Sequence, residues 1–104
     1  MTTKLTREQL MAQIAQAAVD NYQAEADRKS LRYELNALYR TYFAAFGRPY
    51  PSEPRKRIDP EDDAYAGVLH FTRSAYKRWL DARDLTNKTK RKLRTLIQRL
   101  ERSL

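Results

Sequence analysis

The sequence of 104 residues contains no cysteine, two glycines, four prolines and one histidine. Without cysteine, the chain can form neither a disulfide nor a thiolate metal site. Glycine and proline are the main breakers of helices, and all four prolines lie within residues 49–60. Long helices are therefore permitted over most of the chain, where the good helix formers Ala, Leu, Arg, Lys, Gln and Glu dominate. We expect a single all-α domain spanning residues 1–104.

Long apolar runs are also missing. No segment approaches the roughly 18 consecutive apolar residues that a membrane span needs. The first eight residues, MTTKLTRE, lack the apolar run of a signal peptide. We therefore expect a cytoplasmic protein that does not act at a membrane.

The first predicted helix covers residues 7–46, a stretch with no glycine or proline. Thr6 and Gln9 have the spacing of a capping box. Gly47 is the residue type that helices prefer just after their end, and Pro49 prevents the helix from resuming. A continuous helix is the preferred interpretation, and a kink or a junction of two helices near residues 26–30 is the alternative.

The apolar residues of this helix follow a heptad pattern. The predicted seam consists of Leu10, Ile14, Ala17, Asn21, Ala24, Arg28, Leu31, Leu35, Leu38, Tyr42 and Ala45. Asn21 and Arg28 are polar residues on an otherwise apolar seam, a device that can fix the register of packed helices.

Two shorter helices are predicted after a proline-rich connector at 47–59. The first covers 60–83, with Asp59 as its cap and Pro60 at its first position. Gly67 is expected to lie off its apolar face. Residues 84–87 read as a turn in which Thr86 or Asn87 caps a last helix at 87–103.

These lengths predict a helical bundle in which the second helix folds back on the C-terminal half of the first. The N-terminal half then has no obvious cover from the same chain. A two-fold dimer would provide that cover. We therefore expect a homodimer that forms through Leu10, Ile14, Ala17 and Asn21.

No constellation of residues predicts an enzyme. His70 is the only histidine and has no acidic residue one helical turn away, so a general-base role is disfavoured. The acidic run 61–63 opens a predicted helix, where acids are expected because of the helix dipole. We expect no catalytic site, no metal and no cofactor.

The formal net charge of +8 is unevenly distributed. Residues 66–104 carry eleven basic and three acidic side chains, so the C-terminal part contains the excess. On a helical projection, leucines form one face of the last helix and basic residues the other. Such a face can meet the phosphates of DNA or RNA, and the short predicted turn before it resembles that of a helix-turn-helix pair. The predicted nucleic-acid-binding residues are Arg73, Lys77, Arg78, Lys88, Lys90, Arg91, Lys92, Arg94, Arg99 and Arg102.

A protein-interaction module is the alternative function. A small basic protein can act as an adaptor or inhibitor on an acidic or nucleic-acid-binding surface of another protein. Tyr22, Tyr33 and Tyr50 have no predicted place in the core, and tyrosine is enriched at interface hot spots. The run 55–57 is a second basic candidate, but neighbouring acids nearly neutralise its charge.

Overall fold

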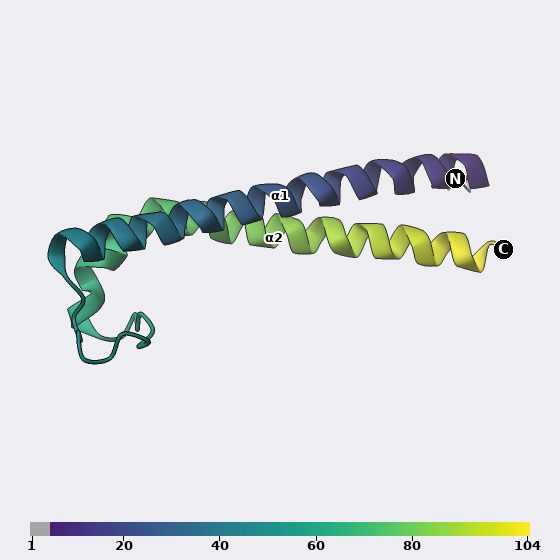
Figure 1. Ribbon diagram of the computed structural model, residues 1–104. Helices are drawn as coiled ribbons and strands as arrows, with labels where there is room; N and C mark the ends of the chain where they lie inside the picture. The colour runs from purple at the N-terminus through teal and green to yellow at the C-terminus, as the bar shows by residue number, and fades with distance from the viewer. Residues whose placement is uncertain (1–4) are drawn as a thin grey trace. The chain divides into compact units, whose positions relative to one another are not determined.

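The computed structural model describes residues 5–104 and contains two long helices and one short 3-10 helix (Figure 1). Helix α1 is Arg7–Phe46, the 3-10 helix η1 is Asp63–Tyr65, and α2 is Ala66–Arg102. In each of the two units described below, the segments of α1 and α2 run antiparallel. The expectation of an all-α protein is confirmed, whereas the expected third helix is wrong.

The chain forms two compact units, and both long helices contribute residues to each unit. The terminal unit combines residues 5–29 with Asp81–Leu104, and the central unit is Ser30–Leu80. The two units are described separately below.

Both ends of α1 are formed as the sequence predicts. The Thr6 amide donates to Gln9 Oε1 at 2.9 Å, and the Gln9 amide donates to Thr6 Oγ1 at 3.1 Å, which completes a capping box. At the other end, Gly47 adopts a φ of 77° and its amide donates to the Phe43 carbonyl at 2.8 Å. Glycine is suited to this left-handed conformation because it has no Cβ. The helix is continuous through residues 26–30.

The start of α2 differs from the prediction. Asp59 does not cap a helix; its carboxylate accepts from the Glu61 amide at 3.0 Å and closes a turn. Asp62 is the N-cap instead, and it accepts from the Ala64 amide at 2.9 Å before η1 leads into α2. Both aspartates have the residue type of a cap, and both bond the amide two residues ahead. The local sequence alone therefore did not distinguish them.

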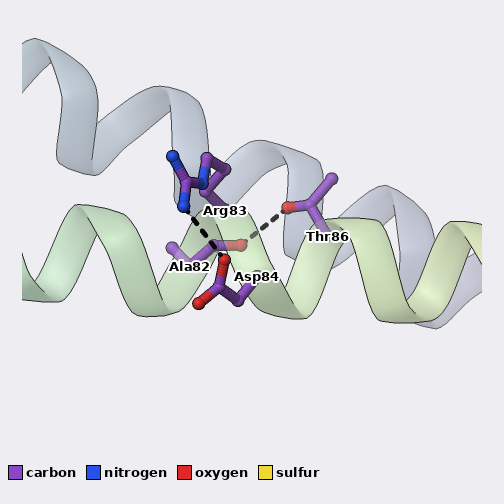
Figure 2. Close-up of polar contacts among 4 residues, drawn as sticks. All are labelled: Ala82, Arg83, Asp84 and Thr86. Atoms are coloured by element: carbon purple, nitrogen blue, oxygen red, sulfur yellow. Dashed lines mark hydrogen bonds and ion pairs between the residues drawn. The ribbon is translucent and has the colours of Figure 1, made fainter.

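The predicted turn at 84–87 lies inside α2 (Figure 2). The Thr86 hydroxyl lies 2.9 Å from the Ala82 carbonyl, one helical turn earlier. It also lies 3.1 Å from the Ala24 carbonyl of α1, so its proton is shared between two acceptors. Threonine can bond the carbonyl four residues back within a helix, and Thr86 does this instead of capping a new helix. The predicted boundary between helices 60–83 and 87–103 is therefore wrong.

The terminal unit has a small apolar core between the two helices. Leu10, Ala17 and Leu96 are buried together, and Ile14, Leu93 and Leu100 pack against them. The heptad seam of α1 thus faces the leucine stripe of α2 within one chain. Ile97 of α2 and Leu104 beyond its end are exposed.

A polar cluster follows this core along the seam. The Asn21 side chain donates to Thr89 Oγ1 at 3.0 Å and approaches the Thr86 carbonyl at 3.5 Å. The predicted role of Asn21 in fixing register therefore has a partner inside the chain. Arg28 is the second polar seam residue, and its Nε is buried without a hydrogen-bond partner among residues 5–104.

The central unit packs the end of α1 against the beginning of α2. Leu35, Val68 and Thr72 are fully buried, and the Thr72 hydroxyl donates to the Val68 carbonyl at 2.8 Å. Tyr42 contacts Phe71 with ring centroids 5.6 Å apart. Gly67, expected off the packing face, instead lies directly against the Tyr42 hydroxyl.

Tyr50 of the connector contacts the residues that lead into α2, and its ring centroid lies 6.1 Å from that of Tyr65. The Tyr50 hydroxyl donates to Asp62 Oδ2 at 2.7 Å. This bond stabilises the Asp62 carboxylate and holds its pKa below the ordinary value of 3.8, with the Ala64 amide acting in the same direction. The same bond raises the pKa of Tyr50, because it stabilises the protonated hydroxyl that donates it; desolvation and the negative charge of Asp62 act in the same direction.

Candidate functional site

Seven of the ten predicted nucleic-acid-binding residues lie on α2 in the terminal unit, and all seven are exposed. They define the basic face: Lys88, Lys90, Arg91, Lys92, Arg94, Arg99 and Arg102. Leu93, Leu96 and Leu100 of the same helix turn toward α1. The helix therefore keeps these three leucines inside the unit and its cations in solvent, as the projection predicts.

The basic face is not neutralised by acids. Within residues 5–104, none of its seven cations makes an ion pair. Asp20 and Asp27 of α1 accept bonds from Gln16 and Gln23 of the same helix, at 2.9 and 3.0 Å. These two carboxylates of α1 thus bond to their own helix, and the seven cations of α2 remain without an ion pair among residues 5–104.

The helix dipole explains only part of this charge. Arg99 and Arg102 lie in the last turn of α2, where cations stabilise the partial negative charge of the helix end. The other five cations lie within 88–94, beyond the reach of that effect. Lys88 is three or four residues from Arg91 and Lys92, and such like-charge pairs each destabilise a helix by about 0.2–0.5 kcal/mol. Repulsion among the cations at 88–94 therefore destabilises the folded chain, and a bound polyanion would reduce this repulsion.

The other three predicted residues, Arg73, Lys77 and Arg78, lie in the central unit. All three are exposed. Arg78 forms an ion pair with Glu34 of α1 at 2.8 Å, which ties α2 to α1 within that unit. Arg73 lines a cavity. We therefore treat these residues separately from the basic face.

The residues assigned to a dimer interface face the inside of the chain. Leu10 and Ala17 are about 97% covered, by the α2 residues described above. The reasoning that they lacked cover was wrong, because α2 extends unbroken to Arg102 and reaches them. A different set of large apolar side chains on α1 of this unit is exposed: Met11, Val19 and Tyr22.

Sequence reasoning missed a cavity of about 970 Å³ in the central unit. Its walls come from α1, the connector and α2. Six cations line it: Arg32, Arg40, Arg48, Lys56, Arg57 and Arg73. The sequence analysis singled out the run 55–57 and, separately, Arg73; the cations are scattered along the sequence, and only folding brings them together. His70, which sequence reasoning considered and disfavoured as a base, is exposed at the same cavity.

Burial raises the pKa of the Tyr39 hydroxyl beside this cavity, while a hydrogen bond with Thr72 and the charge of Arg32 act in the opposite direction. Tyr39 thus keeps its proton at neutral pH and remains a neutral hydrogen-bond donor.

Two features are absent from the part of the chain that the structure describes. In residues 5–104, no group of three or more His, Asp or Glu side chains is arranged to hold a metal ion. No described helix has the length and apolar character to span a membrane.

Comparison with known proteins gives no relative: no family model, no curated protein and no solved structure matches the chain.

Proposed function

We propose that the protein binds nucleic acid through the basic face of α2 in the terminal unit. The observation that carries this proposal is the run of exposed cations at 88–94, unpaired within residues 5–104 and lying beyond the last turn of the helix. Binding to phosphates releases condensed counterions, which supplies a favourable entropy and makes the affinity depend on salt. The proposed activity requires no chemistry on the ligand.

Phosphates rather than base edges are the main target in this proposal. Lysine and arginine spaced along one helical face meet phosphates regardless of base sequence. Thr95 and Gln98 are exposed on the same helix and have the hydrogen-bonding groups to reach base edges. The primary expectation is therefore a salt-sensitive binder with modest sequence preference.

The test compares two variants with the same change in net charge. Arg91→Gln/Arg94→Gln removes two cations of the basic face, and Lys29→Gln/Arg55→Gln removes two exposed cations elsewhere. Affinity for a 20-base-pair DNA duplex and for a single-stranded RNA is measured by fluorescence anisotropy between 50 and 200 mM salt. The first variant should bind more weakly, with a salt slope on DNA shallower by about 2, one for each lost phosphate contact.

Equal losses in the two variants would show that only the net charge matters, and unchanged affinity in the first would reject the basic face. An absence of nucleic-acid binding by the wild-type chain would favour the protein-interaction alternative. In that case, one acidic protein should copurify after nuclease treatment and be released by moderate salt.

We also propose that the chain forms a homodimer through the face of α1 that points away from α2, called the outer face. Met11, Ala15, Ala18 and Tyr22 are all exposed, and their steps of four, three and four residues match a coiled-coil seam. The seam at Leu10 and Ala17 is already covered by α2, so this outer face replaces it in the proposed dimer. A dimer would present two basic faces to one nucleic acid.

A further inference from the structure

The cavity of the central unit has an excess of positive charge. Among residues 5–104, no aspartate or glutamate lines it. Of its six cations, only Lys56 is in an ion pair, with Glu53 at 3.7 Å. Low-dielectric walls with one sign of charge concentrate counterions inside a cleft. The lining therefore favours an anion that carries several charges.

Several of these cations are held in place before any ligand arrives. The Arg48 guanidinium lies 5.0 Å from the Phe43 ring centroid, and its Nη1 donates to the Pro54 carbonyl at 3.1 Å. Lys56 Nζ lies 4.0 Å from the Tyr50 ring centroid. The Arg32 guanidinium lies 4.8 Å from the Trp79 ring centroid. Because these contacts restrict the side chains, less conformational entropy is lost when they bind a ligand.

The rest of the lining is aromatic and aliphatic. Tyr39, Phe43 and Tyr76 contribute rings, and Ile58 and Leu69 contribute aliphatic surface. A volume of about 970 Å³ lies at the upper end of the range for small-molecule sites. A simple ion such as phosphate would leave this apolar surface in water. The cavity therefore suits a ligand that combines several negative charges with a flat apolar group.

We propose that this cavity binds a free nucleotide of the nucleoside di- or triphosphate class. The phosphates lie among the arginines, which match phosphate oxygens with paired N–H donors. The base lies against the rings of Tyr39 and Tyr76. Arg40 and Arg73, on opposite helices of the central unit, have no ion-pair partner among residues 5–104 and are the principal phosphate ligands.

The experiment is a calorimetric titration of the full chain with ATP at low salt. Arg40→Gln/Arg73→Gln removes two cations of the cavity, and Arg55→Gln/Lys77→Gln removes two exposed cations of the same unit that do not line it. The cavity variant should bind ATP about tenfold or more weakly, because it loses charge-assisted hydrogen bonds, whereas the control should change by less than about threefold. Arg40→Lys/Arg73→Lys should recover part of the affinity and also covers the case in which the glutamine variant fails to fold.

Two further titrations of the wild-type chain test the ligand class. Inorganic triphosphate should bind more weakly than ATP because it lacks the base, and adenosine more weakly because it lacks the charge. Absence of ATP binding, equal losses in the two glutamine variants, or triphosphate or adenosine binding as tightly as ATP would each overturn the proposal. Arg91→Gln/Arg94→Gln should leave ATP binding unchanged, so the cavity and the basic face succeed or fail independently.

Discussion

At the scale of single residues, Gly67 of α2 lies directly against the Tyr42 side chain of α1 in the central unit. A Cβ built at this position would overlap the Tyr42 hydroxyl and lie 3.2 Å from Cζ of the same ring. The Tyr42 ring also contacts Phe46 and Phe71, with centroids 4.8 and 5.6 Å away. Gly67 lies in the helical backbone of α2, so its backbone conformation does not require glycine. The close approach of the Tyr42 side chain does.

Gly67→Ala should destabilise the wild-type chain by about 1–3 kcal/mol, because the added methyl group displaces the Tyr42 ring and overpacks the interface. In a Tyr42→Phe background the overlapping hydroxyl is gone. There, the same substitution should be less destabilising, because only the 3.2 Å approach to Cζ remains and the gain in helix propensity of about 1 kcal/mol opposes its cost. Urea unfolding of the four proteins in this double-mutant cycle measures the coupling. Equal effects of Gly67→Ala in both backgrounds would contradict the contact.

At the scale of elements, the sequence predicts a turn at residues 84–87, but α2 is continuous there. This continuity depends on contacts with α1. Asp84, Thr86 and Asn87 all favour turns and caps when considered locally. In the fold, Thr86 is buried and its hydroxyl bonds both its own helix and the Ala24 carbonyl of α1. The Asn21 side chain adds a bond to Thr89 one turn later. The tertiary interface therefore overrides a local preference for a break.

Thr86→Val should destabilise the protein by about 1–3 kcal/mol, because the shape is nearly kept while a buried carbonyl of α1 loses its hydroxyl partner. Thr95→Val is the matched control, since Thr95 lies on the same helix and is exposed. It should change stability by less than about 0.5 kcal/mol. Thermal unfolding followed by circular dichroism measures both. Similar losses in the two variants would mean that the Thr86 hydroxyl contributes nothing specific.

At the scale of the whole molecule, several large apolar side chains of α1 are exposed to solvent, although α2 covers the seam residues Leu10 and Ala17. Met11, Val19 and Tyr22 of the terminal unit are 52%, 62% and 75% exposed. Single exposed apolar residues are ordinary, but Met11 and Tyr22 lie together with exposed Ala15 and Ala18 at steps of four, three and four residues, which match a coiled-coil seam. This is the surface that we assign to a second copy.

Met11→Gln/Tyr22→Gln should weaken self-association by about tenfold or more, because it removes apolar area from the proposed interface without touching the buried seam. Tyr33→Gln/Phe46→Gln is the control: it removes comparable exposed apolar area from the central unit. Sedimentation equilibrium over a wide concentration range measures the dissociation constants. A wild-type chain that stays monomeric throughout, or equal weakening by both variants, would remove the proposed dimer surface.

Local signals in the sequence were sufficient for one part of this protein. The bounds of α1 follow from the Thr6–Gln9 capping box and from Gly47, whose interactions all lie within a few residues. The inward leucines and outward cations of α2 follow from helical periodicity alone. Both kinds of signal act over one or two turns of helix, so no knowledge of distant residues is needed to read them.

The tertiary structure decided what depends on contacts between distant residues. Tertiary contacts keep α2 helical through residues 84–87, so the helix reaches and covers Leu10 and Ala17. The sequence had predicted these two residues at a dimer interface. The tertiary structure also brought Arg40, Arg57 and Arg73 to one cavity from three separate elements. No short-range sequence pattern predicts these contacts between distant residues. The free energy that stabilises them comes from the packing of one helix on the other, which exists only once both helices have formed.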